Sequence, residues 1–433
     1  MQQSAIGQTQ RIRSIDIVRG IAVLGIFTMN AADMAYPQDL VLDFRATDPD
    51  MGWNYWVAFT SEVLFSGKMR GLFTLLFGVS SVLIVERLTR KVDDYTAADY
   101  YFRRLIWLLV LGLANAYIFL WWGDVLFKYA LLGMLLFSFR QASIKILTVA
   151  MLTCIAVLTV QPYTDYREIA DLEQQYIDVQ SKQRSAQPLT PDDYEVVNDW
   201  QEILADTRPD SESIEEEIRI NSGNYAVIFD YNVTRVFEEH TSIFYAEDVW
   251  DMMLFMLLGI MLLRMKYFDE QVPSLVHMAI ALLGIGVGLY VHVWLNLGVS
   301  ANYLDPVTSL YYLTFYDLGR VPFVVGYMSL TILIFRSKIF KYIGDGMAAV
   351  GRMALSNYLM QSIIGAFVFY GFGLAQFNQM SRLDLAVFVF LVWIFQVTFS
   401  VVWMRLFYYG PVEWLWRSLT YWETQPLRRT QMG

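Results

Sequence analysis

DLAVFVFLVWIFQVTFSVVWMRLFY, residues 384–408, is the stretch that decides the fold class. Between Asp384 and Arg405 it contains no charged side chain. About 20 residues of α-helix, each rising 1.5 Å, cross the roughly 30 Å hydrocarbon core of a bilayer. The stretch therefore predicts a transmembrane helix.

The composition of the whole chain extends this prediction. Its 433 residues are 56% hydrophobic and only 17% charged, with a mean hydropathy of +0.38. Ordinary soluble domains carry about a quarter charged residues, so the apolar surplus here must face lipid. We expect an all-α fold, a polytopic membrane helix bundle of about ten transmembrane helices. The ten apolar segments are 15–36, 67–86, 102–121, 124–139, 143–161, 246–264, 273–297, 315–335, 347–371 and 384–408.

Lysine and arginine collect at alternate ends of these segments. Short loops rich in these residues stay on the cytoplasmic side of a membrane. One topology puts every basic group inside, with both termini cytoplasmic and the protein in the inner membrane of the cell. The groups are Arg11 and Arg13; Arg87, Arg90, Lys91, Arg103 and Arg104; Arg140 and Lys145; Arg264 and Lys266; Arg336, Lys338 and Lys341; and Arg417, Arg428 and Arg429.

The connection from 162 to 240 is the acidic part of the chain. It holds 19 acidic and 6 basic residues, a balance of −13 against −10 for the whole protein. We expect an N-terminal bundle at 1–161, made of five helices plus an interfacial helix at 53–66. An acidic helical extracytoplasmic loop follows at 162–244, and a C-terminal bundle with a cytoplasmic tail occupies 245–433.

Charged side chains inside the predicted spans are the first candidates for function. Each costs at least about 2.5 to 3.5 kcal/mol near the bilayer centre. Asp124 and Lys128 are four residues apart, and Asp317 and Arg320 are three apart, so each pair shares one helix face. An outer cluster is predicted from these four residues together with Lys68 and Asp251.

Two uncharged candidates belong near the outer cluster. His292, near the outer end of the seventh segment, is the intramembrane imidazole closest to it. Asn30 lies at the outer end of the first segment.

An inner cluster is predicted from Asp16, Arg19, Arg352 and Asn357. Asp16 and Arg19 are three residues apart at the cytoplasmic end of the first segment, and Gln361 shares a ridge with Asn357 in the ninth. Polar stripes of this kind must face protein or water. Two clusters suit a protein with openings on both sides. The alternative is a set of neutralised ion pairs that fix helix register.

Several function classes have no support in the sequence. The single Cys154 cannot form an intrachain disulfide, and no His, Cys and carboxylate spacing indicates a metal site. No phosphate-binding glycine loop is present, which argues against ATP-driven pumping. We therefore expect no metal and no nucleic-acid partner.

Five motifs carry a family resemblance. They are RSIDIVRGIAVLGIFTMN (13–30), GKMRGLFTLLFGVS (67–80), GDVLFKYALLGMLL (123–136), GRMALSNYLMQS (351–362) and GPVEWLWRSLTYW (410–422). In this order they resemble the YeiB family, whose signature domain has no known function. The resemblance implies membership of a wider superfamily of transmembrane acyltransferases that includes heparan-alpha-glucosaminide N-acetyltransferase and uses cytoplasmic acyl-CoA. It also implies an older alternative, which is a role in transport.

One position departs from the family pattern. Many relatives have a His in a GLxHA-like motif, whereas this chain reads GLANAY (112–117) with Asn115 in that place. An amide is no general base at neutral pH, so Asp124 is the replacement candidate.

Two functions remain open at this point. In a membrane-bound acyltransferase, Arg19, Arg352 and the Arg103/Arg104 pair would hold the phosphates of acyl-CoA, and Asp124 or His292 would remove the acceptor's proton. In a secondary transporter, the Asp124/Lys128 and Asp317/Arg320 pairs would bind a small polar solute or a proton. The expected partners are membrane lipids and a small-molecule, lipid or glycan acceptor, with a homodimer left open.

Overall fold

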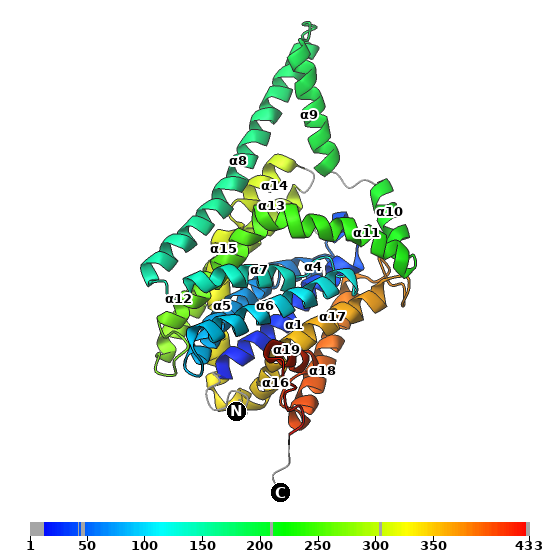
Figure 1. Cartoon of the computed structure of the whole chain (residues 1–433). Coiled ribbons are helices and arrows are strands. Elements are labelled where there is room, and N and C mark those ends of the chain that lie inside the picture. Colours follow the sequence, from blue (N-terminus) through cyan, green and yellow to red (C-terminus); the bar gives the residue numbers. More distant parts are fainter. Residues whose placement is uncertain (1–12, 42, 45–47, 208–210, 303–304, 430–433) are drawn as a thin grey trace.

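The computed structural model describes residues 13–41, 43–44, 48–207, 211–302 and 305–429 (Figure 1). These residues form helices and no β-strand, apart from an isolated bridge between Phe407 and Arg428. The all-α prediction is confirmed. The helices are α1 (Arg13–Ala35), α2 (Gln38–Val41), α4 (Trp53–Leu64), α5 (Lys68–Thr89), α6 (Asp94–Tyr117), α7 (Leu126–Leu136), η2 (Phe137–Phe139), α8 (Ile144–Arg184), α9 (Pro191–Thr207), α10 (Ser211–Asn221), α11 (Tyr225–Glu238), η3 (Glu239–Asp248), α12 (Val249–Arg264), α13 (Ser274–Ala301), α14 (Pro306–Leu313), α15 (Tyr316–Arg336), η4 (Lys338–Phe340), α16 (Lys341–Arg352), α17 (Ala354–Phe369), α18 (Arg382–Leu406) and α19 (Pro411–Tyr421).

Six helical stretches in the described ranges are long and apolar enough to cross a membrane by length and composition. They comprise α1, α4 with α5, α8, α13, α14 with α15, and α18, and the shorter apolar stretches are Leu126–Phe139 and Ala354–Phe369. Helix occupies each of the ten predicted segments. The protein is thus a helical membrane protein, while the number of crossings and their direction stay predictions.

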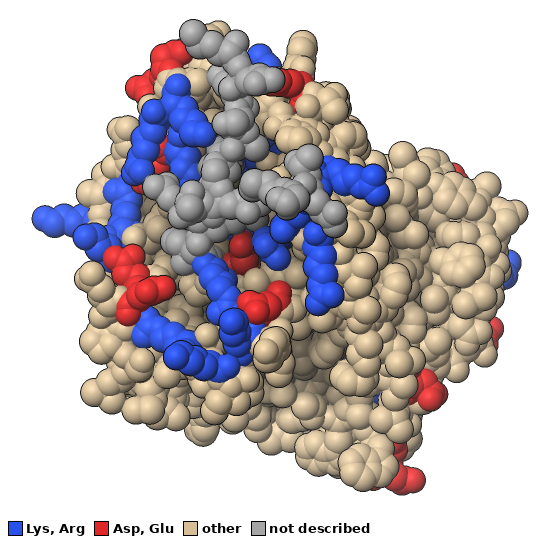
Figure 2. All heavy atoms as spheres, turned by 90° about the horizontal axis from the view of Figure 1, so that it is seen from below, with Lys and Arg blue, Asp and Glu red and all other residues tan. Residues whose placement is uncertain are grey.

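The two ends of the bundle differ in charge. The chain termini lie at the lower end in Figure 1, and the α8–α9 hairpin projects from the upper end. Figure 2 shows lysine and arginine gathered on the lower face. We call this the basic end, and the opposite end the acidic end. Arg11 lies outside the described residues.

Helix α8 differs from its prediction. A break was expected after residue 161, but α8 continues through Pro162 to Arg184 and carries the chain away from the bundle. Its outer half packs on α9, where Lys182 Nζ donates to Asp193 Oδ1 at 2.7 Å. The Lys182 hydrogen bond holds the pKa of the Asp193 carboxyl at about 2. The first part of the acidic segment, up to Arg184, is therefore a continuation of α8.

Helix α1 packs against α16 at two glycines. A Cβ on Gly20 would lie 2.0 Å from the Met347 carbonyl oxygen, and one on Gly351 would lie 1.9 Å from that of Asp16. Only glycine permits this backbone contact. The contact brings Arg19 on α1 and Arg352 on α16 to the same cavity.

Candidate functional site

A cavity of about 230 Å³ opens among α1, α5, α6, α7, α16, α17 and α19. Five arginines line it, together with the two carboxyls of Asp16 and Glu413, so three positive charges are in excess. The arginines are Arg19, Arg87, Arg104, Arg352 and Arg417. An excess of guanidinium groups in a cavity suits a ligand that carries phosphate or carboxylate.

Several of these arginines are held in place by neighbouring side chains. Arg19 donates to Asp16 Oδ1 at 3.1 Å and to Ser80 Oγ at 2.7 Å. The Arg104 guanidinium lies 3.4 Å from the centre of the Trp416 ring. Such contacts fix the planes of the guanidinium groups, which reduces the conformational entropy lost on binding a ligand.

Apolar side chains line the cavity beyond the arginines. Phe77, Leu105 and Leu108 are among them. The α5 lining extends from Phe73 to Arg87, which at 1.5 Å per residue is about 20 Å along the helix axis. The cavity therefore joins a cationic part to a long apolar part.

Two tyrosines line the end of the cavity opposite Arg87. Tyr129 and Tyr358 are both almost fully buried. The Tyr358 hydroxyl accepts hydrogen bonds from Trp121 Nε1 and the Val125 amide, each at 3.2 Å, and donates to Asp124 Oδ1 at 3.4 Å. A single side chain thus links the cavity to a buried carboxyl.

Asp124 lies just before α7, with its side chain fully buried. Asn115 Nδ2 donates to its Oδ1 at 2.8 Å, and the Phe127 amide donates to its Oδ2 at 2.9 Å. Gly112 on α6 makes room for this turn, because a Cβ there would lie 2.4 Å from the Phe127 nitrogen. These uncharged donors orient the carboxyl without a cation in direct contact.

The ninth predicted segment is two helices, α16 and α17, which meet at Met353. Glu413 on α19 accepts hydrogen bonds from the Leu355 and Ser356 amides, at 2.8 and 3.1 Å, at the start of α17. A carboxylate stabilises the free amides of a helix N-terminus. Burial raises the pKa of the Glu413 carboxyl, and hydrogen bonds from Ser356 oppose that rise. The break between α16 and α17 therefore forms part of the cavity wall.

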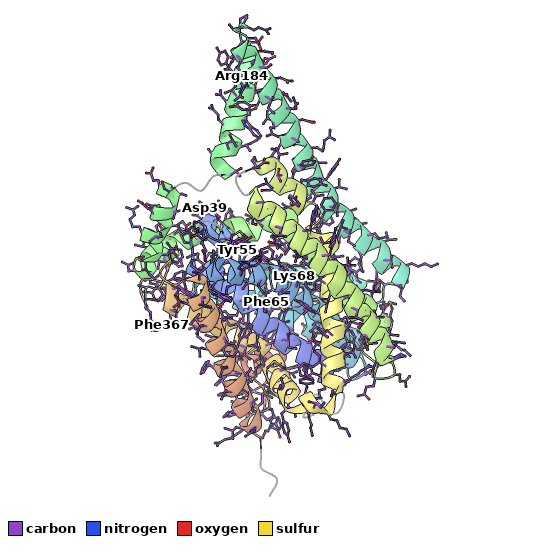
Figure 3. The ribbon with its side chains drawn as sticks, turned by 180° about the vertical axis from the view of Figure 1, so that it is seen from behind. Asp39, Tyr55, Phe65, Lys68, Arg184 and Phe367 are labelled. Atoms are coloured by element: carbon purple, nitrogen blue, oxygen red, sulfur yellow. The ribbon has the colours of Figure 1, made fainter. Side chains whose placement is uncertain are left out.

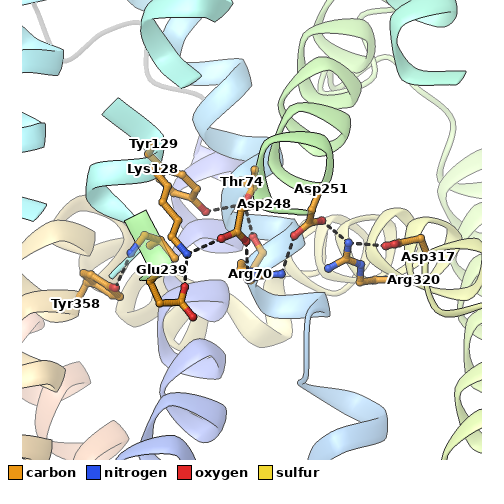
Figure 4. A network of polar contacts seen from close by, with 11 residues as sticks. Arg70, Thr74, Lys128, Tyr129, Glu239, Asp248, Asp251, Asp317, Arg320 and Tyr358 are labelled. Carbon is orange, nitrogen blue, oxygen red and sulfur yellow. Dashed lines mark hydrogen bonds and ion pairs between the residues drawn. The ribbon is translucent and has the colours of Figure 1, made fainter. Parts of the chain in front are cut away.

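A second group of charges, drawn in Figure 4, lies around the start of α5, at the opposite end of that helix from Arg87. Seven residues from α5, α7, η3, α12 and α15 alternate in sign along one line. We call it the charge chain, and its order is Glu239, Lys128, Asp248, Arg70, Asp251, Arg320 and Asp317. Each cation contacts two carboxylates, so the chain ties five helical elements together.

The predicted pair of Asp124 and Lys128 is wrong in its geometry. Helix α7 begins at Leu126, so Asp124 is not on the same helix face as Lys128. Lys128 Nζ donates instead to Glu239 at 2.7 Å and to Asp248. The turn at 124–126 points the Asp124 carboxyl toward Asn115, and this changes its partners.

The other outer candidates divide between two places. Asp251, Asp317 and Arg320 belong to the charge chain. Lys68, labelled in Figure 3, lies at the start of α5. It is fully buried and donates to the Glu62 carbonyl at 3.1 Å. His292 packs edge-on against the Tyr316 ring, away from Asp124, and neither ring nitrogen has a hydrogen-bond partner.

The inner candidates also divide. Asp16, Arg19 and Arg352 line the cavity. Asn357 donates to Ser400 on α18 at 3.0 Å, and Gln361 donates to the Val23 carbonyl on α1 and to Gln396 on α18. These two amides therefore hold helices together and do not line the cavity.

Asn30 is half-buried near the acidic end of α1 and belongs to neither the charge chain nor the cavity lining. The Arg103/Arg104 pair is also separated, because Arg104 lines the cavity whereas Arg103 forms an ion pair with Asp99.

Sequence reasoning missed several residues of both places. Arg87, Trp416, Arg417 and Tyr358 line the cavity, and Glu239 begins the charge chain. Three of these residues, Trp416, Arg417 and Tyr358, lie in the motifs GPVEWLWRSLTYW and GRMALSNYLMQS. These motifs could therefore have indicated them as candidate site residues. Glu239 carries no such signal, since it sits in an acidic stretch.

Comparisons with known proteins agree with the sequence motifs. The family model "Protein of unknown function (DUF418)" matches residues 262–423. The uncharacterized protein YxaH of Bacillus subtilis (strain 168) is 26% identical, across 97% of this chain and 96% of the relative. The uncharacterized protein YeiB of Escherichia coli (strain K12) is 29% identical, across 95% and 96%.

No solved structure matches the chain. The DUF418 match covers the part that contains α13 to α19, including Arg352, Tyr358, Glu413 and Arg417 of the cavity. The likeness to YxaH and YeiB covers both halves of the bundle. The chain is accordingly similar over almost its whole length to YxaH and YeiB, and its residues 262–423 match the DUF418 family model.

Proposed function

We propose that the protein is a membrane-bound acyltransferase that uses acyl-CoA at the basic end and an acceptor from the acidic side. One observation carries the proposal: the cavity joins five arginines to an apolar lining that ends at Tyr358, one hydrogen bond from Asp124. Acyl-CoA has the matching sequence of chemistry, with phosphates at one end and an acyl thioester at the other.

The cavity residues would bind the co-substrate in two parts. Arg19, Arg104 and Arg417 offer planar donors for phosphate oxygens. Phe77 and Leu105 offer an apolar surface for the pantetheine arm and the acyl group. The reacting carbonyl would then lie near Tyr358, within reach of a proton acceptor behind it.

Asp124 is the proposed proton acceptor. An acceptor hydroxyl or amine would give its proton to the Tyr358 hydroxyl, which gives its own proton to the Asp124 carboxylate, as the acceptor's oxygen or nitrogen bonds to the acyl carbon. The carbon–sulfur bond then breaks, and the thiolate of CoA leaves with its electron pair. The buried Asn115 Oδ1 has no hydrogen-bond partner, so it is available to the incoming O–H or N–H group.

Binding of labelled acetyl-CoA to the purified protein tests this function. Arg104→Ala or Arg417→Ala should weaken binding by roughly tenfold, because a hydrogen bond to a charged group contributes about 1.5 to 3 kcal/mol. Arg13→Ala is the matched control: Arg13 also lies at the basic end but pairs with Asp345 outside the cavity lining. Absence of acetyl-CoA binding, or an equal loss in all three variants, would refute the proposal.

A secondary transporter of a small polar solute is the second candidate. The alternating charges near the acidic end favour it, since intramembrane ion pairs of this kind are found on solute and proton pathways. Reconstituted vesicles distinguish the two functions: a transporter moves solute without consuming acetyl-CoA, whereas the acyltransferase releases CoA.

A further inference from the structure

The charge chain contains one more acidic group than basic groups, although the two kinds alternate along it. Because it begins with Glu239 and ends with Asp317, it contains four carboxyls and three cations. The Lys128 and Arg320 side chains are only 4% and 2% exposed. The central Arg70 is 38% exposed, and the other members are largely buried. If every group carries its usual charge, this network has a net charge of −1.

Neighbouring charges do not offset the imbalance, because those facing the chain form opposite-sign pairs of their own. Lys68 stands with Glu62, Arg235 with Glu217, and Arg382 with Asp33. The other acidic groups near the ends of the charge chain add further negative charge. The other basic groups near it are buried imidazoles, and burial disfavours the charged form of an imidazole. These groups are Glu238 and Glu247, and His240 and His292.

An uncompensated charge inside a bilayer is costly, so the network favours a ligand with one positive charge. The described residues contain no group of three or more His, Cys, Asp or Glu side chains that could hold a metal ion. A proton needs no coordination shell, and a carboxyl that already contacts one shared cation can take it.

We propose that the charge chain binds one proton at neutral pH, on the terminal carboxyl Asp317, whose side chain is 10% exposed against 14% for Glu239 at the other end. The interior carboxylates Asp248 and Asp251 each contact two cations, whereas each terminal carboxyl contacts one cation that it shares. Protonating an end therefore removes the net charge and loses the least attraction. The site is independent of acyl-CoA and of the cavity.

The stability of the purified full-length protein as a function of pH tests the site. The folded chain would hold a proton that the unfolded chain releases, so stability falls as pH rises from mildly acidic to mildly alkaline values. Glu239→Gln and Asp317→Asn each remove one negative charge, and each should flatten the fall in melting temperature. Glu238→Gln is the matched control, because Glu238 is an exposed carboxyl at the end of α11 beside Glu239, lies outside the charge chain and should keep the wild-type slope.

Infrared spectra of the wild-type protein provide a readout that does not depend on the variants folding. With isotope-labelled Asp and Glu, a protonated carboxyl C=O band should be present at neutral pH and vanish in alkali together with the fall in stability. Absence of the band, or a slope that Glu238→Gln abolishes as well, would overturn the proposal. So would a melting temperature that rises with sodium ions but not with a bulky organic cation at equal ionic strength, because the ligand would then be a metal cation.

Discussion

The cavity at the basic end and the charge chain near the acidic end both depend on arginine, but in opposite ways. The cavity is lined by five arginines and only two carboxyls, so its open surface carries an excess of positive charge. In the charge chain, Arg70, Lys128 and Arg320 each lie between two carboxylates. Surplus charge in an opening attracts a ligand from outside, whereas alternating charge in a core joins helices.

The largest effect is expected from removing one cation from the charge chain. Lys128→Met leaves Glu239 and Asp248 without the ammonium they share, and we expect a loss of about 3 to 5 kcal/mol in the free energy of unfolding. Thermal unfolding in detergent measures the loss. Adding Asp248→Asn to Lys128→Met should recover part of it, and a double variant as unstable as the single one would contradict the joining role.

Asp124→Asn tests the buried carboxyl behind the cavity. The amide keeps the size of the side chain but cannot accept a proton, so acyl transfer should fall at least a hundredfold while acetyl-CoA binding is retained. Turnover and binding are measured on the same preparation, with Asp384→Asn as a control at the start of α18. Retained turnover in Asp124→Asn would show that another group takes the proton.

The glycine contact that shapes the cavity gives a prediction of intermediate size. Gly351→Ala places a methyl group against the Asp16 carbonyl, so α1 and α16 must separate. We expect a loss of about 1 to 3 kcal/mol in stability, with weaker acetyl-CoA binding because Arg19 and Arg352 move apart. Gly286→Ala on α13 has nothing within 4 Å of its new Cβ and should leave both properties unchanged.

The smallest effect is expected outside the bundle, in the α8–α9 hairpin. The Lys182–Asp193 contact is favoured above the usual pKa of an aspartate, near 3.9, and is lost as pH falls through about 2. Spin labels on α8 and α9 should therefore report wider separation only in strong acid. Asp193→Asn should remove this acid transition, and an unchanged transition would assign it to another carboxyl.

Much of the fold could be predicted from the sequence, because apolar length and basic loops are local properties. Segments such as 384–408 need no tertiary information to be recognised. The continuous α8 could not be predicted, since polar residues and Pro162 signal an end to a membrane segment but do not prevent a helix from continuing into water.

The candidate site could be predicted only in part. Spacing along one helix correctly paired Asp16 with Arg19 and Asp317 with Arg320. Contacts between helices, such as Lys128 with Glu239, depend on packing that the spacing does not contain. Spacing also failed for Asp124, because it assumes a helix where the chain forms a turn.

The length of α8 determines how far the α8–α9 hairpin projects from the bundle at the acidic end. Its 41 residues extend about 60 Å, roughly twice the thickness of a bilayer's hydrocarbon core. The projecting half, with α9 folded back along it, forms a post beside the ends of the other helices (Figure 1). A large rigid body that descends along this post meets its tip before it reaches the bundle. Small molecules, and lipids that diffuse in the membrane plane, can reach the bundle without meeting the tip of the hairpin.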